Sequence, residues 1–167
     1  MPALEDRALV RVRRRAPGLT FDATLAPWWV VGEAAARERA VTNLLDNAAK
    51  WSPPEGRVTV RFSAGVLTVG DQGPGIDAED LPHVFERFYR ARESRGMPGS
   101  GLGLSIVRQV VARHAGTVAV HNREGGGTRF TVVLPGSSSP HRASSERRGT
   151  TGPDRGPRGL PPGPSEP

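Results

Sequence analysis

The chain has 167 residues, which is enough for one domain with its own hydrophobic core. Its formal net charge of +6 would suit nucleic acid, but aromatic residues make up only 5% of it, so bases would find few side chains to stack on. The lack of cysteine excludes disulfides and thiolate metal sites, and no apolar run approaches the ~20 residues that span a bilayer. We therefore expect a cytoplasmic segment that contacts neither nucleic acid nor membrane.

Hydrophobic periodicity predicts the elements of the first third. Residues 3–15 are rich in arginine and amphipathic, which is typical of the end of a helix, and residues 19–24 alternate between apolar and polar as a strand does. A short apolar run at 28–31 is a second candidate strand. The helix predicted over 33–50 should stop at Ser52-Pro53-Pro54, because proline cannot continue a helix.

The rest of the pattern predicts alternating strands and helices. Residues 57–63 and 66–69 alternate and are separated by two turn residues, which indicates a β-hairpin. The pattern over 79–90 is helical with an interruption at Pro82, and that over 102–115 is helical without one. The last two predicted strands are 116–121 and 128–134.

Composition divides the chain into three parts. Residues 1–17 are interpreted as the remnant of a preceding helix or linker, and residues 18–135 as the folded domain. Residues 136–167 are rich in Pro, Gly, Ser and Arg, and Leu160 is their single large aliphatic side chain. Such a segment buries too little apolar surface to offset its chain entropy, so it is predicted to be a disordered tail.

The helix over 33–50 carries a polar face that suits chemistry. At about 100° per residue its apolar residues gather on one side, and Asn43, Asn47 and Lys50 gather on the other. Carboxamide oxygens are ligands for a hard cation, and an ammonium group attracts phosphate. A simply solvated outer face is the alternative for this pattern taken alone.

A glycine-rich run opens the helix over 102–115, with the sequence Gly99-Ser100-Gly101-Leu102-Gly103-Leu104. Glycines at a helix start let backbone N–H groups approach an anion such as phosphate. The spacing fits neither the dinucleotide-binding fingerprint nor the phosphate-binding loop that ends in Gly-Lys-Ser/Thr. A turn that only permits close packing is the alternative.

A second glycine-containing turn follows the strand over 66–69 and reads Asp71-Gln72-Gly73-Pro74-Gly75. A partly buried carboxylate at this point is stabilised only if it accepts hydrogen bonds, and the exocyclic amine of adenine can donate one. Guanine has an oxygen at that position, so such a site would select adenine. Taken alone, the segment is also typical of a turn capped by Asp71.

Five segments in order resemble the N, G1, F, G2 and G3 boxes of the ATP-binding domain of sensor histidine kinases, in the GHKL (Bergerat) superfamily and of actinobacterial type. They are Asn43–Lys50, Asp71–Gly75, Phe85-Glu86-Arg87-Phe88-Tyr89-Arg90, Gly99–Leu104 and Gly127-Thr128. The resemblance covers roughly residues 18–135. It implies a two-layer α/β sandwich, with a mixed sheet of about five strands and three main helices on one face, that binds ATP and Mg²⁺.

The resemblance also implies a role for each matching residue. Asn47 would coordinate Mg²⁺ with support from Asn43, and Lys50 and Arg90 would contact the phosphates, so that Asn43, Lys50 and Arg90 form the catalytic set. Asp71 would bind the adenine amine, and Thr128 would close that pocket through a water. The implied nucleotide-binding set is Asn43, Asn47, Lys50, Trp51, Asp71, Gly73, Gly75, Ile76, Phe88, Arg90, Gly99, Ser100, Gly101, Leu102, Gly103, Leu104 and Thr128.

Asn43 distinguishes this chain from the ATP-hydrolysing members of the superfamily that it resembles. In gyrase and the Hsp90 chaperones a Glu one turn before the metal-binding Asn acts as the base for water, whereas the amide of Asn43 cannot accept a proton at useful pH. The resemblance therefore implies transfer of the γ-phosphate to a histidine on a dimerisation domain, in two-component signalling with a response regulator.

None of His83, His114, His121 and His141 stands in the His box of that family. We therefore expect the acceptor domain to lie outside this chain, in a longer and membrane-anchored parent or in a separate protein, and the chain to be inactive alone. Two alternatives stay open: a non-catalytic or truncated ATP-binding regulatory module, and a serine kinase of the anti-sigma type. That last group usually keeps the Glu that Asn43 replaces.

Overall fold

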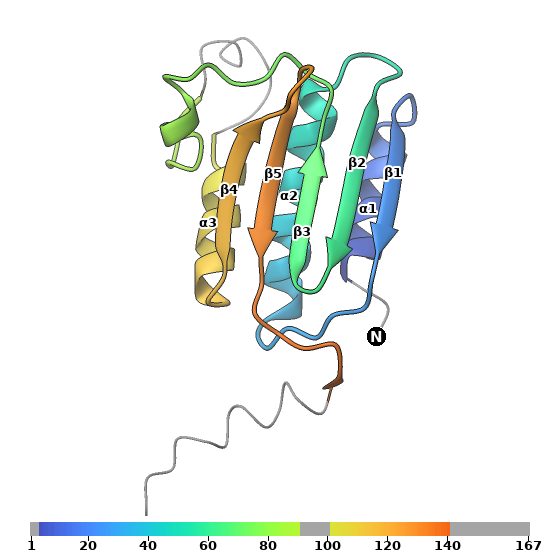
Figure 1. Cartoon of the computed structure of the whole chain (residues 1–167), viewed down its shortest axis with the longest axis vertical. Helices are drawn as coiled ribbons and strands as arrows, with labels where there is room; N and C mark the ends of the chain where they lie inside the picture. Colours follow the sequence, from blue (N-terminus) through green and yellow to red (C-terminus); the bar gives the residue numbers. More distant parts are fainter. Residues whose placement is uncertain (1–3, 91–100, 141–167) are drawn as a thin grey trace, which may run out of the picture.

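The computed structural model describes residues 4–90 and 101–140, and in them three α-helices cover one face of a five-stranded sheet (Figure 1). The elements are α1 (Leu4–Arg15), β1 (Thr20–Leu25), α2 (Ala34–Trp51), β2 (Arg57–Ser63), β3 (Val66–Gly70), the 3₁₀ turn η1 (Leu81–His83), α3 (Gly103–Arg113), β4 (Thr117–Asn122) and β5 (Thr128–Val133). The predicted two-layer α/β sandwich is confirmed.

The strands lie in the order β1-β2-β3-β5-β4 and make a mixed sheet. β1 and β2 are parallel because α2 carries the chain back along the sheet between them, whereas the other pairs are antiparallel. The β2–β3 hairpin turns at Ala64 and Gly65, whose φ angles of 49° and 79° are those of a tight turn that matches strand twist.

The core lies between the sheet and the helices. Alternate residues of β2, namely Val58, Val60 and Phe62, face the helices and are at most 2% exposed, as the period of two predicts. α2 crosses the middle of the layer and buries Leu44 and Leu45. The other face of the sheet carries the intermediate and exposed residues of the same strands, which is how an antiparallel sheet with one solvated face reads.

α1 is part of this core. Ala8, Leu9 and Val12 are buried in the same hydrophobic cluster as α2 and the sheet. Two ion pairs join the outer edge of the two helices, with Arg11 Nη2 3.0 Å from Glu38 Oε1 and Arg15 Nη2 3.2 Å from Asp46 Oδ2. The sequence interpretation left residues 1–17 outside the domain, because an amphipathic stripe does not say which surface covers it.

Two other predicted elements differ from the structure. Residues 28–31 form no strand, and only Trp29 pairs with Ser137 as an isolated antiparallel bridge. Over residues 79–90 the described chain contains the single turn η1 in place of a helix, and Phe88, with a left-handed φ of 62°, cannot belong to a right-handed helix. Of the predicted tail the structure describes residues 136–140, and residues 141–167 lie outside the described part.

Candidate functional site

The polar face of α2 meets the start of α3. Asn43 and Asn47 are half-buried one turn apart, as predicted. Asn43 Nδ2 donates a hydrogen bond to Gly103 O over 3.2 Å, which joins the N and G2 segments. Asn47 makes no hydrogen bond to a described residue, so its carboxamide oxygen is open to a ligand.

Lys50, at the last turn of α2, lies close to a second cation. Its ammonium is 5.5 Å from the centre of the Trp51 ring, and the side chain is half-buried. Burial lowers the pKa of Lys50 from its ordinary value, and the positive charge of Arg90 lowers it further. Two cations held near each other are an arrangement that a polyanion stabilises.

Asp71 follows β3 and is 1% exposed. Its Oδ1 accepts hydrogen bonds from the backbone N–H of Gly73 at 2.9 Å and of Thr128 at 3.1 Å, and Oδ2 receives none from a described residue. Burial raises the pKa of Asp71, which those two hydrogen bonds and the charge of Arg123 partly offset. The result is a carboxylate with one oxygen fixed and one oxygen left to accept a donor.

Two glycines allow the backbone to close around Asp71. A Cβ at Gly127, whose φ is +90°, would overlap the carbonyl oxygen of Asp71, so this position of the G3 segment accepts only glycine. A Cβ at Gly73 would lie 2.5 Å from Trp51 O. The G1 segment is therefore pressed between the end of α2 on one side and the turn before β5 on the other.

The F and G2 segments also touch. Phe88 N donates to Gly101 O over 3.1 Å, and the Phe88 ring is 66% exposed. Leu102 O accepts hydrogen bonds from Ile106 N and Ser105 Oγ at the start of α3, and Leu104 packs against the core. The remaining two G2 residues of the prediction, Gly99 and Ser100, lie outside the described residues.

The contacts above bring parts of all five predicted segments to the end of the sheet where β3 and α2 finish (Figure 1). Sequence reasoning missed two residues that hold this region together. Asn122 and Arg123, at the end of β4, bond to Ile76 and to Asp71 O. No periodicity marks them, because their partners lie 46 and 52 residues away.

The donor set suits magnesium better than a metal held wholly by protein. Among the described residues no three His, Cys, Asp or Glu side chains gather as a metal-binding group. Mg²⁺ usually keeps several waters and binds one or two protein oxygens together with phosphates, so the carboxamide of Asn47, which makes no hydrogen bond to a described residue, fits it.

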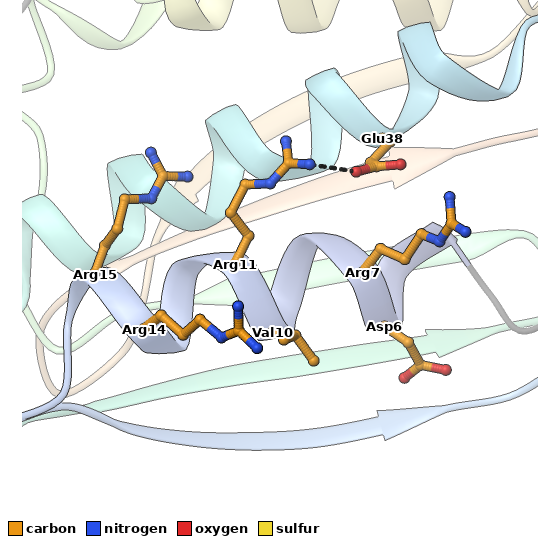
Figure 2. Close-up of a pocket in the computed structure, with 7 residues that line it drawn as sticks. All are labelled: Asp6, Arg7, Val10, Arg11, Arg14, Arg15 and Glu38. Atoms are coloured by element: carbon orange, nitrogen blue, oxygen red, sulfur yellow. Dashed lines mark hydrogen bonds and ion pairs between the residues drawn. The ribbon is translucent and has the colours of Figure 1, made fainter.

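A separate open hollow lies along the exposed side of α1 and reaches α2 at Glu38 (Figure 2). In the close-up, Arg11 extends toward Glu38, and Val10, which is 48% exposed, lies among the arginines. The residues that line the hollow are Asp6, Arg7, Val10, Arg11, Arg14, Arg15 and Glu38, and none belongs to the five segments.

Comparison with known proteins agrees with this architecture. The family model described as "Histidine kinase-, DNA gyrase B-, and HSP90-like ATPase" matches residues 32–138. A solved structure titled "Mycobacterial sensor histidine kinase MprB" is 49% identical, with a TM-score of 0.74 over 80% of this chain and 93% of that one. The chain therefore belongs to the histidine kinase-, DNA gyrase B- and HSP90-like ATPase family, as a catalytic ATP-binding domain of the sensor histidine kinase class.

Among curated proteins, the chain is similar to the signal transduction histidine-protein kinase/phosphatase MprB of Mycolicibacterium vanbaalenii, at 50% identity over 86% of this chain and 31% of that protein. Its similarity to the MprB of Mycobacterium tuberculosis is 46% over 84% of this chain and 30% of that protein. The chain thus spans about 30% of the length of these relatives. No helix in the described part of the chain is both long and apolar enough to cross a bilayer.

Proposed function

We propose that this site binds Mg-ATP and transfers its γ-phosphate to a histidine of a dimerisation domain, carried by a longer parent or by a separate protein. The observation that carries the proposal is that Asn43 Nδ2 donates to Gly103 O over 3.2 Å. By resemblance to the family, this amide would stand where the hydrolytic members carry a carboxylate. This contact joins the helix that would hold the metal to the segment that would hold the phosphates.

The adenine end of the site is Asp71. Its fixed Oδ1 and unengaged Oδ2 suit a base that donates from an exocyclic amine, and adenine has that amine where guanine has an oxygen. Burial to 1% exposure strengthens such a hydrogen bond, because the surroundings compete for it less than water does. Gly73, Gly75, Ile76 and Thr128 form the backbone frame around the base.

The phosphate end of the site is cationic. Lys50 and Arg90 would neutralise the phosphate oxygens, and backbone N–H groups at the start of α3 would add donors. Asn47 would hold Mg²⁺ through its carboxamide oxygen, and the bound ion would supply charge neutralisation to the transferring phosphoryl group. The domain then positions ATP and stabilises charge, which is most of what phosphoryl transfer requires.

Hydrolysis is disfavoured because the residue one turn before Asn47, where a base for water would stand, is Asn43. The amide of Asn43 accepts no proton, and its Nδ2 is engaged with Gly103 O. The nucleophile must therefore be one that needs no base to remove a proton before it attacks, as is true of the neutral imidazole of a partner histidine. A cognate response regulator would take the phosphoryl group next, and the reaction would run at the cytosolic face of the parent.

The transfer is tested by mixing the chain with a separately produced dimerisation domain from a relative and γ-labelled Mg-ATP. We expect acid-labile, base-stable label on that domain, lost when its His is replaced by Gln. Absence of label under conditions where the chain binds ATP would favour a regulatory ATP-binding module. Acid-stable label would favour a serine kinase.

A further inference from the structure

The loop after β3 is held at both ends by two consecutive residues, Asn122 at the end of β4 and Arg123 just after it. This loop, residues 71–76, crosses the end of the sheet beside the turn between β4 and β5 (Figure 1). At its start, Arg123 Nη1 donates to Asp71 O over 2.8 Å. At its far end, the side chain of Asn122 forms hydrogen bonds with the backbone of Ile76. Both ends of the loop are therefore fixed by the same neighbouring segment.

The contact at Asn122 is reciprocal. Ile76 N donates to Asn122 Oδ1 over 2.8 Å, and Asn122 Nδ2 donates to Ile76 O over 2.7 Å. A carboxamide is the side chain that satisfies one backbone N–H and one backbone C=O with the same planar group. Gly75 comes just before, at a φ of +85°, and a Cβ there would lie 3.0 Å from Asn122 Oδ1.

The hydrogen bonds between Asn122 and Ile76 are not part of the pairing between β4 and β5. Asn122 is an exposed residue at the end of β4, paired in register with Thr128, and its side chain adds no apolar packing. Its two hydrogen bonds go entirely to the loop that ends at Ile76 and begins at Asp71. Any effect of Asn122 on the site should therefore act through the conformation of loop 71–76.

We propose that Asn122 and Arg123 are positioning residues that hold the adenine-recognition loop in its binding conformation. The inference rests on the proposed function, since it concerns the base-binding end of the same site. We call Asn122 and Arg123 together the clamp. A loop that is already ordered loses less conformational entropy when the base enters, so the clamp raises affinity for the base without touching it. The phosphate end, which lies on α2 and α3, should not depend on it.

The test compares Asn122→Ala, Asn122→Asp and, as a control on the same strand, His121→Ala. Each variant is titrated with Mg-ATP, Mg-GTP and inorganic tripolyphosphate, and its melting temperature is measured. For Asn122→Ala we expect about a three- to tenfold loss of ATP affinity, the size expected for two exposed hydrogen bonds. Tripolyphosphate affinity should be unchanged, and the preference for ATP over GTP should narrow.

Asn122→Asp should lose at least as much ATP affinity as Asn122→Ala, because it keeps the acceptor for Ile76 N but turns an acceptor toward Ile76 O. His121→Ala should bind ATP as the wild type does. Faster amide hydrogen exchange at Ile76 in both Asn122 variants, with an unchanged melting temperature, would identify the loop as the part released.

Arg123→Met tests the other end of the clamp by its pH profile. The groups that face Asp71 are the Arg123 guanidinium and the backbone N–H groups of Gly73 and Thr128. Without the guanidinium, the acid limb of ATP binding should move to higher pH, an effect that a merely structural residue would not produce.

Two results would overturn the clamp. One is unchanged ATP affinity in both Asn122 variants, and the other is an equal loss for ATP and tripolyphosphate. Failure of the wild-type chain to bind ATP at all would instead overturn the proposed function, so the two failures are distinguishable.

Discussion

Asn43 Nδ2 donates a hydrogen bond to Gly103 O, across 60 residues of sequence and over 3.2 Å. It ties the middle of α2 to the first residue of α3. A carboxylate at position 43 would face that carbonyl with an acceptor in place of a donor. The amide that the proposed function puts in place of a hydrolytic base therefore also fixes the start of α3.

Replacing Asn43 tests this link. Asn43→Ala removes one hydrogen bond and should cost about 1 kcal/mol of unfolding free energy, whereas Asn43→Asp sets two acceptors against each other and should cost about 1–3 kcal/mol. Urea unfolding measures both. Equal stability of Asn43→Asp and the wild type at neutral pH would show that the contact with Gly103 does not support the fold.

Asp71→Asn separates binding from stability. The raised pKa means that the ionised carboxylate is less favourable in the folded protein than in the unfolded chain, so a neutral amide of the same shape should leave the melting temperature equal or higher. ATP affinity should fall about 10- to 100-fold, because a charged acceptor for the adenine amine is lost. Calorimetric titration and thermal melting of the same sample measure the two effects.

The pH dependence of Asp71 should have opposite signs in the two measurements. Because its folded pKa lies above the ordinary value of 3.8, the folded state binds the proton more tightly, so this residue adds stability as pH falls through that range. ATP affinity should fall in the same range, since binding needs the ionised form. In Asp71→Asn both trends should disappear, and their persistence would assign the titration to another group.

Lys50→Met tests how the nearby positive charges of Lys50 and Arg90 affect the melting temperature of the protein. Burial and Arg90 lower the pKa of Lys50, so its charge is unfavourable in the free protein. Removing it should leave the melting temperature without ATP unchanged or higher, and should greatly reduce the rise in melting temperature that saturating Mg-ATP produces. An equal ATP-induced rise in both proteins would place Lys50 outside the phosphate site.

Gly101 and Gly103 form a matched pair in the G2 segment. Gly101 has a φ of +73°, and a Cβ there would lie 2.9 Å from Tyr89 O, so Gly101→Ala should cost about 1–3 kcal/mol of unfolding free energy. A Cβ at Gly103 would meet Asn43 at 3.9 Å, which is ordinary contact. Gly103→Ala should therefore fold normally yet bind ATP more weakly. The contrast fails if both variants are equally destabilised in urea.

Leu9 and Val10 provide a second matched pair that tests whether α1 belongs to the domain. Leu9 is 4% exposed and Val10 is 48% exposed. Leu9→Ala should cost about 2–5 kcal/mol, and Val10→Ala at most about 0.5 kcal/mol. Equal and small effects in denaturant unfolding would support the domain boundary at residue 18 that the sequence suggested.

Sequence pattern was informative where one face of an element packs and the other does not. The hairpin of β2 and β3 and the helix that carries Asn43 were predicted to within a residue or two, because apolar side chains repeat there at the period of the structure. The segment around Pro82 has a helical spacing of apolar residues, yet the proline and a left-handed Phe88, with a φ of 62°, allow only a turn.

What the sequence left out consists of contacts between distant segments. The five boxes could be named as a set from their resemblance to a family, but Asn43 with Gly103 and Asn122 with Ile76 pair side chains to backbone far along the chain. Backbone partners carry no residue signature, so such bonds are seen only in a structure. The packing of α1 in the core could not be predicted for a similar reason. The apolar face of a helix does not show in the sequence which surface it packs against.

Under the proposed function, one site binds ATP for transfer to histidine and not for hydrolysis. The most direct measurement follows γ-labelled Mg-ATP with the chain alone and with a dimerisation domain added. We predict stable ATP when the chain is alone, and acid-labile label on the added domain that Asn47→Ala and Asp71→Asn both greatly reduce. Steady release of labelled inorganic phosphate by the chain alone, with no label on the domain, would show that the site hydrolyses ATP and does not transfer its phosphate to histidine.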